Sequence, residues 1–107
     1  MQQLTKEELE QILLQKETFC LYLYTPLCGT CQVASKMLAV VEAMLPKLKM
    51  IKADLNYLPD IAKNFKIESV PCLLIFRNGM LEKKVYAFKS VPYIYEILKD
   101  LENHRLI

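Results

Sequence analysis

The sequence predicts an α/β fold with a mixed central sheet and helices on both faces. Three observations support this fold class. Runs of β-branched and aromatic residues alternate with segments whose apolar residues have helical spacing. A strand, a long helix and another strand follow in that order, which indicates a parallel pair with a right-handed crossover. Asn78-Gly79 is a strong hairpin signal, which makes the last two strands antiparallel.

Each predicted element has a local signal. Thr5 and Glu8 have the spacing of a capping box at the start of the first helix. Pro26 ends the first strand, and Pro46 stops the long helix. The long helix has one apolar face, made by Val33, Met37, Leu38, Val41 and Leu45. The predicted elements are helices at about 6–16, 29–44, 59–67 and 91–103, and strands at 18–25, 48–55, 70–76 and 81–88.

Composition limits the class of protein. The 107 residues suit one domain, 1–107, and 53% hydrophobic with 24% charged residues is a globular composition. The net charge of +2 is scattered, with no basic block, which argues against nucleic acid as the partner. The polar start lacks a signal-peptide pattern, and no apolar run is long enough to span a membrane. We therefore expect a cytosolic protein that binds no membrane and keeps most of its four cysteines reduced.

Cys28 and Cys31 form a C-x-x-C motif that fits a metal knuckle, a structural pair or a redox centre. The motif falls where a buried strand gives way to the long helix. A helix N-terminus offers free N–H groups and partial positive charge, which stabilise a thiolate. Cys28 is then the attacking thiol, and Cys31, one turn later and deeper, resolves the mixed disulfide. Gly29 lets a substrate backbone approach closely. This position favours the redox centre.

Val70-Pro71 opens a buried strand about forty residues later, and such a bond can be cis. With the C-G-x-C motif and the Asn-Gly turn, it makes the chain resemble thioredoxin from about Thr18 to Asn103. The resemblance implies the thioredoxin fold and dithiol/disulfide exchange.

The resemblance also implies roles for individual residues. Cys28 would be the nucleophile and Cys31 the resolving thiol. Val70-Pro71 would be the cis-proline segment that pairs with the substrate backbone. Lys52 matches a partly buried lysine that the family places near the active site.

Leu27, Gly29 and Thr30 are the other expected substrate-binding residues, because they flank or separate the cysteines. For Lys52, two interpretations stay open. It is either a cation that helps to lower the thiol pKa or a strand-end lysine whose ammonium reaches water.

Several positions depart from the family pattern, among them Lys36, near the place of the helix proline that usually follows the motif. Leu27 replaces the usual tryptophan, and Thr30 replaces the proline between the cysteines. Tyr22 stands where thioredoxins carry a buried aspartate that helps to deprotonate the resolving thiol. A phenol is a weak base at neutral pH, which leaves open how Cys31 loses its proton. Cys72 replaces a threonine, and Tyr86 replaces a glycine that keeps the substrate groove open. The chain therefore resembles a divergent thioredoxin-like protein.

The first functional hypothesis is a cytosolic thiol–disulfide oxidoreductase that needs no cofactor beyond its Cys28–Cys31 disulfide. Its expected partners are protein disulfides and an electron donor, either a thioredoxin reductase or a low-molecular-weight thiol, and the chain is expected to be a monomer. The alternative is a partner-binding adaptor with little reductase activity. A third reading places Cys72 beside the pair as a ligand for a soft metal or an iron–sulfur cluster, whereas the simpler one treats Cys72 as a small core residue.

Overall fold

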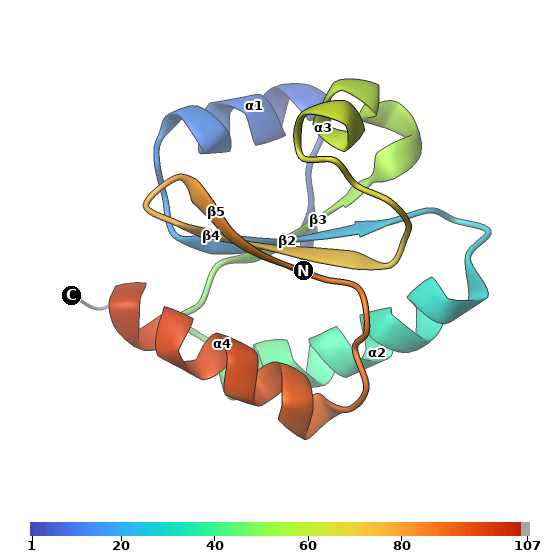
Figure 1. Ribbon diagram of the computed structural model, residues 1–107. Coiled ribbons are helices and arrows are strands. Elements are labelled where there is room, and N and C mark those ends of the chain that lie inside the picture. Colours follow the sequence, from blue (N-terminus) through green and yellow to red (C-terminus); the bar gives the residue numbers. More distant parts are fainter. Residues whose placement is uncertain (106–107) are drawn as a thin grey trace.

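The computed structural model describes the backbone of residues 1–105 and the side chains of residues 1–102 (Figure 1). Its elements are β1 (Gln2–Gln3), α1 (Lys6–Leu14), β2 (Phe19–Tyr24), α2 (Gly29–Met44), β3 (Met50–Asp54), the 3₁₀ turn η1 (Leu55–Tyr57), α3 (Pro59–Asn64), β4 (Cys72–Arg77), β5 (Met80–Val85) and α4 (Val91–Arg105).

The strands form one five-stranded sheet in the order β1-β3-β2-β4-β5. β1, β3 and β2 are parallel, whereas β4 runs antiparallel to both β2 and β5. The predicted mixed sheet is therefore confirmed. Strand β1 has no counterpart among the predicted elements, because two residues at a sheet edge are too few to give a strand pattern.

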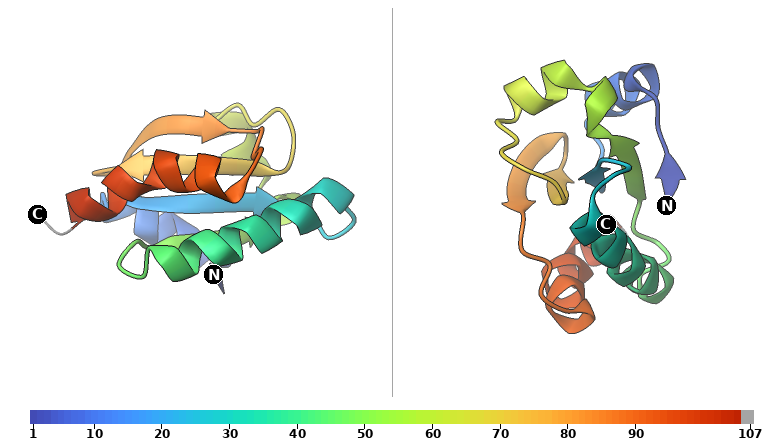
Figure 2. Two further views of the ribbon diagram at one scale, coloured as in Figure 1. Left: turned by 90° about the horizontal axis from the view of Figure 1, so that it is seen from below. Right: turned by 90° about the vertical axis from the view of Figure 1, so that its right-hand side faces the viewer.

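The helices cover both faces of the sheet, as Figures 1 and 2 show, with α1 and α3 on one side and α2 and α4 on the other. Side chains of β2 alternate between the two cores. Cys20 and Tyr22 pack toward α2 and α4, whereas Phe19, Leu21 and Leu23 pack in the cluster of the opposite face. All five are buried, as predicted for a strand covered on both sides. No helix within residues 1–105 is long and apolar enough to cross a membrane.

Helices α1 and α3 end earlier than predicted, at Leu14 and Asn64, and two further details differ from the sequence prediction. Val33 was placed on the apolar face of α2, but it is 56% exposed, and Ala34 is buried instead. Val33 lies in the second turn of α2, where the helix projects past the end of the sheet (Figure 1). The last strand was predicted to reach Phe88, but β5 ends at Val85, so Tyr86 lies in the connection to α4.

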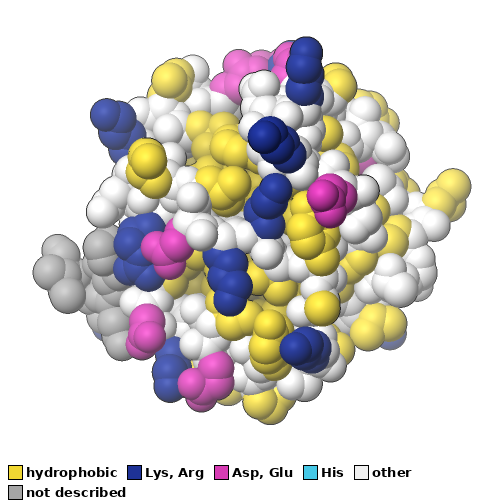
Figure 3. All heavy atoms as spheres, in the orientation of Figure 1, with side chains coloured by type: hydrophobic (Ala, Val, Ile, Leu, Met, Phe, Trp, Pro, Cys, Tyr) yellow, Lys and Arg dark blue, Asp and Glu magenta, His cyan; other side chains and the backbone are white. Residues whose placement is uncertain are grey.

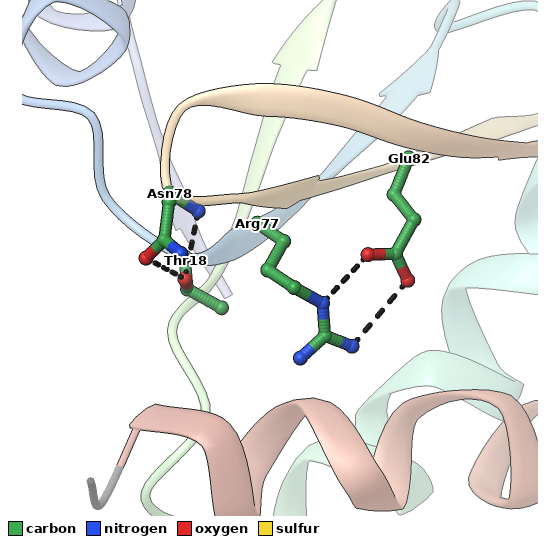
Figure 4. A network of polar contacts seen from close by, with 4 residues as sticks. All are labelled: Thr18, Arg77, Asn78 and Glu82. Carbon is green, nitrogen blue, oxygen red and sulfur yellow. Dashed lines mark hydrogen bonds and ion pairs between the residues drawn. The ribbon is translucent and has the colours of Figure 1, made fainter.

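The hairpin between β4 and β5 has the predicted Asn-Gly turn. Asn78 and Gly79 have φ values of 54° and 81°, as a two-residue turn of this kind requires. A Cβ on Gly79 would lie 2.7 Å from the Cα of Lys16, so the backbone approach also requires glycine. The Thr18 hydroxyl accepts a 3.0 Å hydrogen bond from the Asn78 N–H and anchors the turn to the start of β2 (Figure 4).

β5 forms one edge of the sheet, and charged side chains protect it. Arg77 and Glu82 form an ion pair across the hairpin with a shortest N···O distance of 2.6 Å (Figure 4). Lys83 and Lys84 follow in the same strand. Lysines and arginines lie among apolar patches on the face that carries this edge (Figure 3). Charge on an edge strand discourages pairing with another chain.

Candidate active site

The cysteine pair lies where β2 ends and α2 begins, on the right-hand side of Figure 1. Cys28 is the N-cap residue of α2, with extended backbone angles. Its sulfur accepts a hydrogen bond from the backbone N–H of Cys31 at 3.1 Å. This N–H is one of the helix-start donors that have no partner within the helix. A sulfur thus occupies the place that a serine or aspartate oxygen takes in an ordinary helix cap.

Cys28 and Cys31 are joined by a disulfide, with their Cα atoms 5.1 Å apart. Cys28 is half-buried, whereas Cys31 is only 2% exposed. The sulfur of Cys28 also lies 3.4 Å from the Thr30 hydroxyl. Cys28 is therefore accessible to an incoming partner molecule, whereas Cys31 is buried beneath Cys28.

The local electrostatics favour a thiolate at Cys28 once the disulfide is reduced. The first turn of α2 contains no acidic residue. The helix N-terminus adds partial positive charge, and the Cys31 N–H and Thr30 hydroxyl are within hydrogen-bonding distance. Such surroundings stabilise the charged form of a cysteine sulfur.

Two hollows flank the pair. Cys28 and Cys31 line the first, and Pro71 and Thr30 line the second. The other residues of the first hollow are Tyr24, Thr25, Pro26, Gln32, Ser35 and Lys36. The second hollow is completed by Val33, Ala34, Met37, Tyr86, Phe88 and Lys89. An accessible sulfur between two apolar hollows suits the binding of a disulfide in a polypeptide.

Of the other substrate-binding candidates, Pro71 and Thr30 line the second hollow, whereas Leu27, Gly29 and Val70 line neither. The Val70-Pro71 peptide bond is cis, as the resemblance implied, and both residues are half-buried just before β4. Leu27 is fully exposed, and Gly29 has open space around its Cα. The motif and the segment before β4 lie at the same end of the sheet (Figure 1).

Tyr22 lies under the first turn of α2. Its ring is fully buried, and its hydroxyl donates a 2.7 Å hydrogen bond to the backbone carbonyl of Cys31. The Ser35 hydroxyl donates in turn to the Tyr22 oxygen at 3.2 Å. Burial raises the pKa of Tyr22 above its ordinary value, so the phenol is neutral at pH 7. Tyr22 therefore positions Cys31 and does not act as a base.

Replacing Tyr22 with phenylalanine should lower the free energy of unfolding by about 1–2 kcal/mol, because one buried hydrogen bond is lost and the Ser35 hydroxyl loses its acceptor. Urea denaturation of the oxidised protein measures this. Tyr57→Phe is the matched control, since Tyr57 is 74% exposed, and it should leave the stability unchanged. Equal stabilities for wild type and Tyr22→Phe would contradict this role.

Lys52 lies beside the site without lining it. It pairs in register with Tyr22 on the neighbouring strand β3. Its ammonium lies 5.8 Å from the centroid of the Tyr24 ring, a cation–π contact. Tyr24 lines the hollow of the cysteine pair, whereas Lys52 does not. The Lys52 ammonium therefore contacts the ring of Tyr24, and only that ring borders the cysteine pair.

Cys72 does not join the cysteine pair. It is fully buried in the core cluster on the α1 and α3 face, and burial raises its pKa to about 11. A thiol with this pKa is protonated at neutral pH and is a poor nucleophile or metal ligand. Within the described part of the chain, no three His, Cys, Asp or Glu side chains come together as metal ligands. These residues give no support to the metal or cluster hypothesis.

Two residues near the site, Ser35 and Lys84, were not recognised from the sequence, and Tyr86 was expected to narrow the groove but not to bond the backbone. Ser35 follows Cys31 by four residues, so helical spacing alone places both on one side of α2. Lys84 and the hydroxyl of Tyr86 bond backbone atoms between Phe65 and Glu68. No sequence pattern indicates those bonds, because they join segments that are distant in the chain.

A half-buried cysteine disulfide-bonded to a buried one at a helix start, beside a cis X-Pro bond, defines a thiol–disulfide oxidoreductase. The thioredoxin family model matches residues 1–100. The thioredoxin-like protein YusE of Bacillus subtilis is 50% identical over 100 residues, which cover 94% of this chain and 92% of that protein. This chain belongs to the thioredoxin family.

Other relatives and solved structures agree. Thioredoxin-1 of Saccharomyces cerevisiae is 27% identical over 81 residues, or 76% of this chain and 79% of that one. Oxidised mitochondrial thioredoxin 3 from the same yeast superposes with a TM-score of 0.79 at 23% identity, over 94% of both chains. Oxidised thioredoxin from Plasmodium falciparum gives a TM-score of 0.79 at 16% identity, over 94% of this chain and 96% of that one. These two structures establish the thioredoxin fold.

Proposed function

We propose that this protein is a cytosolic oxidoreductase that reduces or exchanges protein disulfides through Cys28 and Cys31. The observation that best supports the proposal is the arrangement of the pair, with Cys28 half-buried at the N-cap of α2 and Cys31 buried beneath it. Thioredoxin family members act on protein disulfides and interact with reductases, which fits this arrangement. The expected electron donor is a thioredoxin reductase or a small thiol, and the expected working form is a monomer.

The proposed reaction moves two electrons from the cysteine pair to a substrate disulfide. The Cys28 thiolate attacks one substrate sulfur, the substrate S–S bond breaks, and the leaving thiolate takes up a proton from water. A mixed disulfide now joins Cys28 to the substrate. Cys31 loses its proton and attacks the Cys28 sulfur, which forms the Cys28–Cys31 disulfide and releases the second substrate thiol. The reverse sequence oxidises a dithiol.

Each site residue has a proposed role in that sequence. Val70 and Pro71 would pair with the backbone of the substrate, and Leu27 would contact it as a fully exposed apolar side chain. Gly29 lets the substrate come close, because nothing lies within 4 Å of where its Cβ would be. Thr30 would donate a hydrogen bond to the thiolate from its hydroxyl.

Lys52 is proposed to support the Cys28 thiolate as a nearby cation, through the ring of Tyr24. This role predicts a modest effect. Lys52→Met should slow disulfide reduction by less than about tenfold, since the ammonium does not line the hollow of the pair.

The redox potential of the pair should lie somewhat above the roughly −270 mV of thioredoxin. Thr30 makes the loop between the cysteines less rigid than proline would. Tyr22 is also neutral, so this position adds no negative charge that would oppose the thiolate, and a stabilised thiolate makes the pair more oxidising. Equilibration with glutathione redox buffers measures the potential.

The matched variant for this measurement is Thr30→Pro. It should shift the potential in the negative direction by roughly 30 mV, which corresponds to about 1.4 kcal/mol for two electrons. A wild-type potential more negative than that of thioredoxin would overturn the prediction.

An adaptor function is the second candidate, and the side chain of Tyr86 favours it. Tyr86 is half-buried and lines the hollow beside Pro71, where the family usually leaves the groove open. A narrowed groove suits one partner better than many. Insulin reduction driven by dithiothreitol separates the two functions. An oxidoreductase accelerates it well above dithiothreitol alone, whereas an adaptor leaves the rate at that background.

A further inference from the structure

Two side chains at the β5 edge hold the segment that leads to the cis proline. The Lys84 ammonium donates to the backbone carbonyls of Phe65 and Lys66, at 3.1 and 3.2 Å. These carbonyls lie just past the end of α3, where a helix leaves acceptors without partners and a cation is favourable. Lys84 thus anchors the start of the segment that leads from α3 to Pro71.

Tyr86 holds the same segment on both sides of the cis bond. Its hydroxyl oxygen accepts a hydrogen bond from the Glu68 N–H at 3.2 Å. The same hydroxyl also lies close enough to the thiol of Cys72 to interact with it electrostatically. Glu68 precedes Pro71 by three residues and Cys72 follows it directly, so one phenol spans the segment.

The ring of Tyr86 also borders the docking region. It lines the hollow that contains Pro71 and Thr30, next to the redox pair. A bound polypeptide would lie in this hollow, whereas a small disulfide needs only the sulfur of Cys28. Loosening residues 68–72 should therefore weaken the reduction of polypeptide disulfides and leave the reduction of small disulfides unchanged.

We propose that Tyr86, supported by Lys84, is a positioning residue that holds residues 68–72 ready to dock a polypeptide disulfide, and so selects protein over small disulfides. This inference rests on the proposed reductase function. Its physical basis is preorganisation. A segment that is already ordered loses little conformational entropy when a substrate binds, so binding is tighter.

The test compares a protein disulfide, insulin, with a small one, hydroxyethyl disulfide, in the full-length protein. Tyr86→Phe keeps the ring and removes the hydroxyl, and Lys84→Met keeps the side-chain stem and removes the charge. Each should raise KM for insulin by about fivefold or more with kcat little changed, as expected for the loss of one or two hydrogen bonds. Turnover of hydroxyethyl disulfide should stay within about twofold of wild type. Lys83→Met, in the same strand, should match wild type on both substrates.

The outcomes separate the two proposals. Unchanged KM for insulin in both variants, or equal losses on both substrates, would overturn the positioning role. If the wild-type protein reduced neither insulin nor hydroxyethyl disulfide, the reductase function would be overturned instead. Activity of the variants on hydroxyethyl disulfide also shows that they are folded.

Discussion

Replacing Cys28 with serine should reduce the rate of disulfide reduction by about 10³-fold or more, to the background of the reductant alone, because the attacking sulfur is lost. Cys31 cannot substitute for it, since this residue is only 2% exposed. The Cys31 N–H at the helix start also donates to the sulfur of Cys28. Insulin turbidity with dithiothreitol, and reduction of hydroxyethyl disulfide, measure the loss.

Cys72→Ala is the matched control for this variant. Cys72 is fully buried away from the pair, and its pKa of about 11 keeps it protonated. The control should keep most of the wild-type activity on hydroxyethyl disulfide, which does not need residues 68–72. If Cys28→Ser retained more than about a tenth of that activity, the assignment of the nucleophile would be wrong.

The second large effect is expected for Cys31→Ser, which should accumulate mixed disulfides between Cys28 and its substrates. Attack by Cys28 is still possible, but the resolving thiol that would displace the substrate is gone. The adducts then persist until an external thiol cleaves them. Non-reducing electrophoresis after incubation with a protein disulfide, followed by peptide mapping, identifies the bonded cysteine.

The double variant Cys28→Ser/Cys31→Ser controls for adducts at other thiols. Both Cys20 and Cys72 are buried, so it should form none. The mechanism would fail this test if Cys31→Ser formed no adduct, or if the adduct mapped to Cys20 or Cys72.

The sequence was sufficient to predict most of the fold. The uninterrupted apolar run of β2 and the Asn78-Gly79 turn have direct physical signals in composition and backbone preference. The two-residue strand β1 has none, because its place depends on parallel pairing with β3. The exposure of Val33 was also missed, since helical periodicity identifies a face but not where the sheet beneath it ends.

The sequence was sufficient to predict where the cysteine motif lies, but not the side-chain contacts around it. The position of Cys28 and Cys31 at the strand–helix junction follows from the local pattern, and the structure has them there. The pairing of the Tyr22 hydroxyl with the Cys31 carbonyl depends on how α2 crosses β2. The reach of Tyr86 to Glu68 depends on how β5 leaves the sheet. Such contacts are set by tertiary packing, which one sequence does not reveal.

The most direct test of the central claim is to count thiols after one turnover. The fully reduced protein is mixed with a limiting amount of insulin, quenched with acid, alkylated under denaturing conditions and analysed by mass spectrometry. The account predicts that two thiols are lost per insulin disulfide reduced, at Cys28 and Cys31, while Cys20 and Cys72 stay reduced. Loss of thiols at Cys72, or insulin that stays oxidised while Cys28 and Cys31 remain thiols, would contradict it.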